Sequence, residues 1–189
     1  RRVTVVDKGV FKSFLMSRSP IEGFPQSNGH GRRQQGFAPV ARQSNLIVEV
    51  ARPLSRQILK QRLLEEVKKT NKPFGLYFED IQGGFTITQR TIPNAFNVLP
   101  IIVYRVYPDG REELVRGVDL IGTPLTAFSK IVAGSNEVGV FNGICGAESG
   151  SVPVAAASPE ILVEQIEVQK KEKSQERPPL LPPPFEVGR

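Results

Sequence analysis

The 189-residue chain is 39% apolar and 23% charged, which predicts a globular domain rather than a disordered chain. Its formal net charge is +6, but the lysines and arginines form no stripe interleaved with aromatic residues, so we do not expect nucleic acid as a partner. The 17 glycines and 16 prolines favour a β-rich fold, and the absence of an apolar run of about 18 residues excludes a membrane-spanning segment.

The N-terminal segment is predicted to begin with a β-hairpin. Two runs rich in β-branched and aromatic residues, Val3–Val6 and Val10–Met16, flank the turn sequence Asp7-Lys8-Gly9. Ser17–Arg42 then consists largely of glycine, proline, serine, asparagine and arginine. A loop of this length is typically functional or disordered, and a plain surface loop is the alternative. The alternating pattern of Asn45–Val50 predicts a strand.

One long helix is predicted from about Arg56 to Thr70. Ser55 can cap its N-terminus, and Asn71 and Pro73 end it. Four apolar residues fall on one face at helical spacing, and we expect this face to pack on the core: Ile58, Leu59, Leu63 and Val67.

The middle of the chain predicts short strands. Strands are expected at Phe74–Glu79 and Phe85–Gln89, with Gly83-Gly84 breaking the chain between them. Pro108-Asp109-Gly110 is typical of a tight turn, so the sequence on its two sides predicts a hairpin. The strands of this hairpin and the one after it are expected at Val98–Tyr107, Glu112–Arg116 and Val118–Ile121.

A short second helix is predicted next, with Thr123 as its cap, Pro124 in its first position and Gly134 ending it. Its buried face should comprise Leu125, Phe128, Ile131 and Val132. Short extended pieces, Val138–Phe141 and Ser151–Ala155, are expected around Cys145, and Ile161–Val168 as a closing strand.

The composition changes at Gln169. Mixed charge gives way to Pro178-Pro179 and Pro182-Pro183-Pro184, which favour extended polyproline geometry. We therefore expect a domain over residues 1–168 and a charged, proline-rich tail over 169–189. The fold class predicted is α+β, mainly an antiparallel or barrel-like sheet with two helices.

The lone histidine, His30, excludes several kinds of site. A His-Glu-x-x-His zinc site needs two histidines one helical turn apart, and a Cys/His zinc finger needs more cysteines than Cys145 alone. Nothing in the sequence places Cys145 beside His30 as a catalytic dyad. A single cysteine forms no intrachain disulfide, so nothing indicates an oxidising compartment and we expect a cytoplasmic location. By chemistry alone, Cys145 is either a small buried apolar residue or a reactive or metal-binding thiol.

Several stretches together resemble one family. Asn142-Gly143-Ile144-Cys145-Gly146, followed by Ser149-Gly150-Ser151-Val152-Pro153-Val154, is similar to the C-terminal signature of the TldD/PmbA family, zinc metallopeptidases also called modulators of DNA gyrase. The segments 27–33, 42–46 and 115–122 resemble further family segments in the same order. The resemblance covers about Val3 to Val168.

The resemblance implies a metal site to which Cys145 contributes. In active members, zinc is held by two histidines of a His-Glu-x-x-x-His helix and by a cysteine that Cys145 matches, while the glutamate of that helix is the general base. Zinc is therefore the expected cofactor, and an unfolded peptide, added as a strand at a sheet edge, is the expected substrate. Candidate substrate-binding residues are Asn28, Arg32, Asn45 and Gly146; plain solvation of a charged loop is the alternative.

The His-Glu-x-x-x-His helix is missing from these 189 residues. Three explanations are open: the helix lies upstream in a longer protein, it is supplied by a separate chain, or this chain is an inactive relative without it. The partners expected are an N-terminal portion or a subunit of the same family, in a homo- or heterodimer, and the chain alone is expected to be inactive. Ser151-Val152-Pro153-Val154 favours the active, TldD-type subunit. A non-catalytic scaffold subunit is the alternative, and a gyrase-associated module is a third hypothesis that no recognition element supports.

Overall fold

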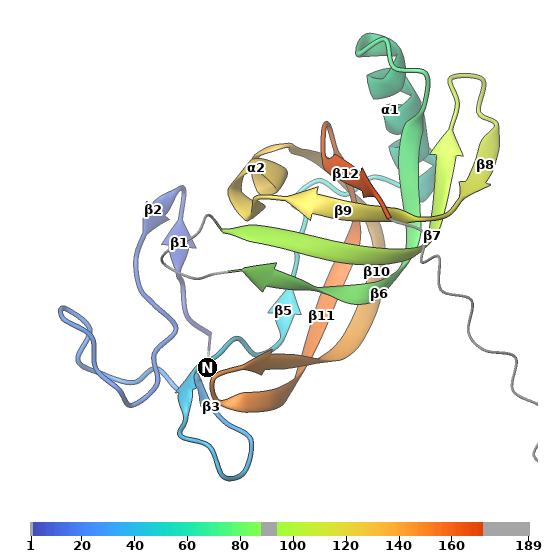
Figure 1. Cartoon of the computed structure of the whole chain (residues 1–189). Coiled ribbons are helices and arrows are strands. Elements are labelled where there is room, and N and C mark those ends of the chain that lie inside the picture. Colours follow the sequence, from blue (N-terminus) through green and yellow to red (C-terminus); the bar gives the residue numbers. More distant parts are fainter. Residues whose placement is uncertain (1, 88–93, 172–189) are drawn as a thin grey trace, which may run out of the picture. The chain divides into compact units, whose positions relative to one another are not determined.

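The computed structural model describes residues 2–87 and 94–171, and its chain is traced in Figure 1. The chain forms two compact units. The first combines the chain up to Leu59 with Ala133–Leu162, and the second combines Lys60–Val132 with the chain from Val163. Most strands pair antiparallel and two helices accompany them, so the predicted α+β class is confirmed, although none of the described sheets closes on itself.

The first unit begins with small two-stranded pieces. β1 (Val6–Asp7) and β2 (Val10–Phe11) form the predicted hairpin, which is shorter than expected, and its turn is made by Lys8 and Gly9 at φ 48° and 81°. Within the predicted loop, β3 (Gly31–Arg32) pairs antiparallel with β4 (Val40–Ala41). The loop is therefore ordered by its own short ladder.

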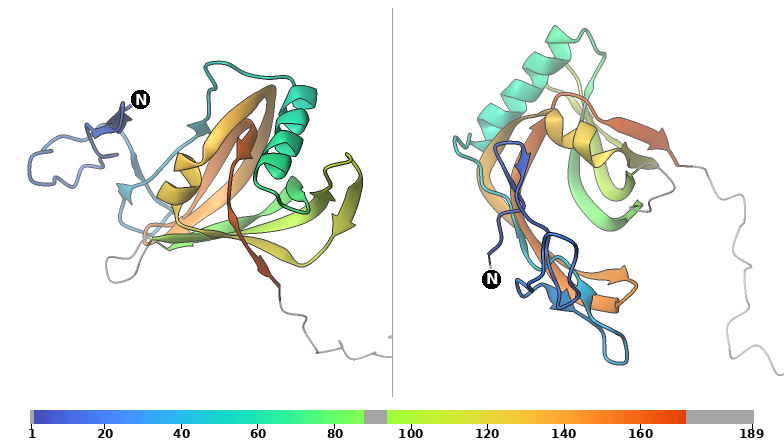
Figure 2. Two further views of the ribbon diagram at one scale, coloured as in Figure 1. Left: turned by 90° about the horizontal axis from the view of Figure 1, so that it is seen from above. Right: turned by 90° about the vertical axis from the view of Figure 1, so that its left-hand side faces the viewer.

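A long hairpin dominates the first unit. β10 (Ile131–Ala147) and β11 (Gly150–Val163) run side by side in both views of Figure 2, and β5 (Leu46–Ile47) pairs parallel with β11. The expected short pieces around Cys145 are thus parts of two long strands. The predicted closing strand Ile161–Val168 is wrong: β11 ends at Val163, and a separate strand, β12, covers Glu167–Lys170.

The second unit is built on an open antiparallel sheet in the order β12-β9-β7-β6, with β8 also pairing β7. The remaining strands are β6 (Gly75–Ile87), β7 (Ala95–Val106), β8 (Glu112–Val115) and β9 (Val118–Gly122). The β7–β8 hairpin turns where predicted, with Gly110 donating its N–H to the Tyr107 carbonyl at 2.8 Å. The buried apolar residues of the second unit are all aliphatic: Val67, Val103, Val106 and Leu120.

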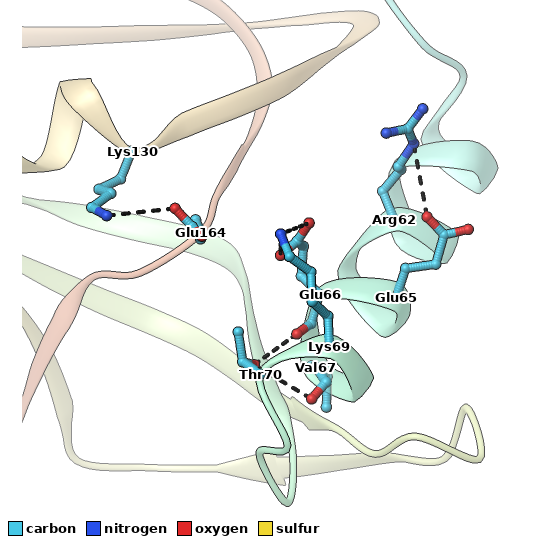
Figure 3. Close-up of polar contacts among 8 residues, drawn as sticks. All are labelled: Arg62, Glu65, Glu66, Val67, Lys69, Thr70, Lys130 and Glu164. Carbon is cyan, nitrogen blue, oxygen red and sulfur yellow. Dashed lines mark hydrogen bonds and ion pairs between the residues drawn. The ribbon is translucent and has the colours of Figure 1, made fainter.

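Helix α1 (Arg56–Lys69) confirms the predicted long helix. Its Ile58 N–H donates to the Ser55 hydroxyl at 3.3 Å, and Asn71 takes φ 51° just beyond its end, as a helix C-terminus favours. Figure 3 shows the last turn, where Thr70 donates its hydroxyl to the Glu66 carbonyl and Lys69 pairs with Glu66. The prediction that Ile58 lies on the buried face is wrong, since Ile58 is 45% exposed.

The glycine pair of β6 does not break the strand. β6 continues through Gly83 and Gly84, with register shifts against β7 between Phe78 and Gly83, so the pair lies at a bulge. A Cβ on Gly84 would lie 2.4 Å from the Asn97 carbonyl oxygen, so this glycine permits close strand approach. The predicted strand Phe85–Gln89 therefore belongs to β6, and its last two residues lie outside the described ranges.

Helix α2 (Pro124–Ser129) is shorter and more exposed than predicted. It ends before Gly134, because β10 already begins at Ile131, and Thr123 uses its hydroxyl on Thr126 rather than as a backbone cap. The four residues expected to form its buried face are all exposed in this chain: Leu125, Phe128, Ile131 and Val132. The predicted buried face is therefore wrong, and no described segment covers these residues. The predicted tail from residue 172 onward lies outside the described residues.

Candidate functional site at the end of the β10–β11 hairpin

Cys145 lies in β10, two residues before the strand ends at Ala147. Its side chain is half-buried, flanked in the strand by Ile144 and Gly146, which are both exposed. Alternate strand residues share a face, so Cys145 lies on the same face as Gly143 and Phe141. The thiol is thus neither sealed in an apolar core nor fully open to solvent.

The Phe141 ring lies against Gly143 on this face. A Cβ placed on Gly143 would come within 2.6 Å of the phenyl ring. Because Gly143 has no side chain, the ring can lie flat over the strand beside the cysteine position. Gly146, on the other side of Cys145, has open space where its Cβ would be, so none of the described residues requires a glycine there on steric grounds.

Arg42 is the main polar contact at this end of the hairpin. It is only 5% exposed, and its guanidinium donates to the Ser149 hydroxyl at 2.7 Å, the Gly150 carbonyl at 3.0 Å and the Cys145 carbonyl at 2.5 Å. Ser149 is completely buried. One side chain from the loop after β4 therefore joins both strands and the turn between them.

Gln34 and Arg32 fasten the same hairpin from β3 and the residues after it. The Gln34 N–H donates to the Ser149 carbonyl and its side-chain oxygen accepts from the Ser151 N–H, both at 2.9 Å. Arg32 donates to the Pro153 carbonyl in β11 and to the Gln43 carbonyl at 2.9 Å. The loop predicted as functional or disordered thus serves as a clamp for the hairpin.

Asn28 and His30 hold the first part of this loop. Asn28 Oδ1 accepts from the Met16 N–H at 2.7 Å and lies 3.0 Å from His30 Nδ1, while Asn28 Nδ2 donates to the Phe14 carbonyl at 2.8 Å. An amide oxygen can only accept, so this contact requires the tautomer with the proton on Nδ1. The buried His30 in turn accepts the Arg42 N–H on its carbonyl at 2.9 Å. Both side chains are occupied in holding the chain that presents Arg42.

The predicted site residues divide into two groups. Cys145 and Gly146 are neighbours in β10, and Arg32 contacts β11 of the same hairpin. Asn28 is instead tied to Phe14 and Met16, and Asn45 is exposed just before β5.

Sequence reasoning missed the residues that hold the hairpin: Gln34, Arg42 and Ser149. The only signal was indirect, since Arg42 begins one of the stretches that resemble the family and Ser149 lies in another. A lone arginine in a polar loop gives no indication that it is buried.

A metal ion would need further ligands besides Cys145. Among the residues that the structure describes, no group of three or more histidine, cysteine, aspartate or glutamate side chains could hold one. A tetrahedral zinc site takes three or four protein ligands, of which a half-buried thiolate is a suitable one. The residues that the structure describes therefore do not make a complete zinc site by themselves. Within residues 2–87 and 94–171, neither helix has the length and apolar character that a membrane crossing requires.

The sequence profile of the PmbA/TldA metallopeptidase C-terminal domain matches residues 1–170. The chain therefore belongs to this family of metallopeptidase C-terminal domains, as the motifs around Cys145 predicted. It is also 28% identical over 158 residues to a protein of Archaeoglobus fulgidus named metalloprotease, a match that covers 84% of this chain and 34% of that relative. The chain thus spans about a third of the relative's length.

Proposed function

We propose that this chain is the part of a zinc metallopeptidase that supplies one metal ligand, the Cys145 thiolate, and a strand edge for an unfolded peptide substrate. The observation that carries the proposal is the placement of Cys145. It is half-buried at the end of a hairpin that Arg42, Gln34 and Arg32 hold in place, within a domain of a metallopeptidase family.

The other ligands would come from the His-Glu-x-x-x-His helix that these 189 residues lack, located upstream in the same protein or on a partner subunit. Zinc, when bound, supplies Lewis acidity that activates water and polarises a carbonyl. In this chain, Cys145 would hold the metal, and the Phe141 ring beside it would limit the access of bulk water on that face. The chain alone would be inactive.

The edge of β10 supports binding of an extended peptide. In the described sheet its strand neighbour is β11, and the only further bridge to β10 among the described residues joins Leu54 to Ser135, far along the strand from Cys145. An unpaired edge offers N–H and C=O groups to an added strand. The exposed Val138, Val140 and Ile144, at 60%, 67% and 74% exposure, lie on the face of β10 opposite the thiol and would give such a peptide apolar contact along the strand.

The test uses the complete protein that contains this chain together with the metal-binding helix. Zinc content per molecule and hydrolysis of an unstructured peptide are measured for the wild type, for Cys145→Ala and for Ile144→Ala, which changes the exposed neighbour on the opposite face of β10. We expect Cys145→Ala to lose zinc and activity, because removing one of three protein ligands opens the site, and Ile144→Ala to keep its zinc.

If Cys145→Ala retains stoichiometric zinc, the thiol is a packing residue and the proposal is wrong. The chain would then be better described as a non-catalytic subunit that acts by forming an oligomer with its partner.

A further inference from the structure

Arg42 is a buried cation whose acceptors all belong to the end of one hairpin. Its two terminal nitrogens contact the Cys145 carbonyl, the Gly150 carbonyl and the Ser149 hydroxyl. Ser149 is 0% exposed and Arg42 is 5% exposed, so these contacts are shielded from water. The planar guanidinium can reach several acceptors at once in a fixed geometry, which a lysine ammonium cannot reproduce.

Burying this charge costs free energy unless hydrogen bonds compensate it, so its presence calls for an explanation. None of the ion pairs of the described residues involves Arg42, so neutral oxygens alone compensate its charge. A buried charge needs such hydrogen bonds to be tolerated, and an apolar side chain would fill the same space at lower cost. What the arginine adds over an apolar residue is a fixed position for the oxygens it binds.

Arg42 is itself held on its main chain. It directly follows β4, which pairs with β3, and its N–H donates to the carbonyl of the buried His30. The guanidinium is thus presented by a fixed piece of backbone. It contacts the main chain of the residue that carries the thiol, two residues before β10 ends.

We propose that Arg42 is a positioning residue for the metal site. By binding the Cys145 carbonyl together with Ser149 and Gly150, it fixes the backbone from which the thiol reaches the metal. This inference rests on the proposed function, in which Cys145 is a metal ligand. In this arrangement Arg42 contacts neither the metal nor the substrate and acts only through Cys145.

The experiment uses the complete protein and four variants. Arg42→Lys keeps the charge but loses the planar group, and Ser149→Ala removes one acceptor. Leu162→Ala is a control that destabilises the same unit at the far end of β11, where Leu162 is 7% exposed. Cys145→Ala reports on the thiol. Zinc dissociation constants, melting temperatures and, after cobalt substitution, the thiolate-to-cobalt charge-transfer absorption are measured for each.

We expect Arg42→Lys to weaken zinc binding about 10–100-fold and to reduce the charge-transfer band, as found when residues that orient metal ligands are changed. Ser149→Ala should weaken zinc binding less, by about 3–10-fold, since Arg42 keeps two acceptors. Leu162→Ala should lower the melting temperature while leaving the zinc affinity and the band unchanged.

Three outcomes decide the matter. If Cys145→Ala loses the band while Arg42→Lys and Ser149→Ala bind zinc as the wild type does, Arg42 is only structural and this inference fails alone. If Cys145→Ala keeps the band and the zinc, the proposed function fails with it. If Arg42→Lys does not fold, Ser149→Ala decides, because an unchanged affinity and band in that variant rejects the positioning role.

Discussion

Both units bury apolar side chains, but among the described residues only the first also buries polar ones. In the second unit the buried residues are aliphatic, with Val103, Val106 and Leu120 lying in its sheet strands. All five buried polar residues of the described chain fall in the first unit: Ser17, His30, Arg42, Ser135 and Ser149. Apolar burial stabilises a fold without directing any one atom, whereas hydrogen-bonded polar groups fix particular atoms in place. The first unit is therefore the one in which hydrogen bonds among buried groups fix particular atoms.

The largest effect should come from the apolar core of the second unit. Val103 is 2% exposed and pairs with Phe78 and Val115 on either side. Val103→Ala removes two methyl groups and leaves a cavity, so we expect a loss of about 2.5 kcal/mol in the free energy of unfolding. Urea denaturation measures this loss, and hydrogen exchange should place the weakened protection in β6, β7 and β8.

Ile101→Ala is the matched control in the same strand. Ile101 is 53% exposed, so its truncation should cost about 0.5 kcal/mol or less. Equal losses for the two variants would contradict the description of the second unit as one stabilised by its buried valines.

A smaller effect should distinguish the two hairpin turns. Gly150, in the first unit, has φ 81°, and a Cβ there would lie 2.6 Å from the Gln34 side chain. Gly110, in the second, has φ 88° with open space around it. An alanine costs about 1 kcal/mol for the left-handed backbone alone, so we expect about 1 kcal/mol for Gly110→Ala and about 2 kcal/mol or more for Gly150→Ala, where Gln34 must also move.

Thermal or urea unfolding of both glycine variants checks this difference. Gly150→Ala should also raise hydrogen exchange at Ser151, whose N–H donates to Gln34. Similar costs at the two glycines would show that the clamp around the first unit's turn is no tighter than an ordinary surface turn.

The smallest effect is expected on the surface of α1. Arg62 and Glu65, drawn in Figure 3, lie 3.9 Å apart, and their side chains are 60% and 69% exposed. Water and salt screen such a pair, so Glu65→Gln should change stability by less than about 0.5 kcal/mol. A loss above 1 kcal/mol in urea titrations at moderate salt would mean that surface charge contributes to the second unit alongside its aliphatic core.

Local patterns predicted the elements whose stabilising contacts lie close in sequence. Helix α1 follows from the Ser55 cap and the spacing of Leu59, Leu63 and Val67, and the β7–β8 turn from Pro108-Asp109-Gly110. A pattern of this kind is satisfied within a few residues, so the sequence alone reveals it.

Features that depend on distant partners could not be predicted in the same way. The apolar residues of α2 indicated a covered face, but the pattern does not say what covers it, and Leu125 is 84% exposed here. Gly83 and Gly84 suggest a break in the chain when the sequence is read alone. Only the pairing with β7 shows that β6 continues through them with a bulge. The resemblance singled out Cys145, whereas Arg42, which holds its main chain, acts across more than 100 residues of sequence.

The division of the first unit into two sequence segments has a consequence for synthesis and folding. Arg42 is hydrogen-bonded to Ser149 and Gly150, which lie 107 and 108 residues later in the sequence. Likewise, β5 can pair only after β11 has been synthesised. On the ribosome, the N-terminal half of this unit therefore emerges long before its partner strands and cannot close until translation has passed β11. Loop closure over such separations is slow, and unpaired edges are exposed meanwhile. The second unit's β6–β7–β8 meander, by contrast, can assemble while the chain is still growing.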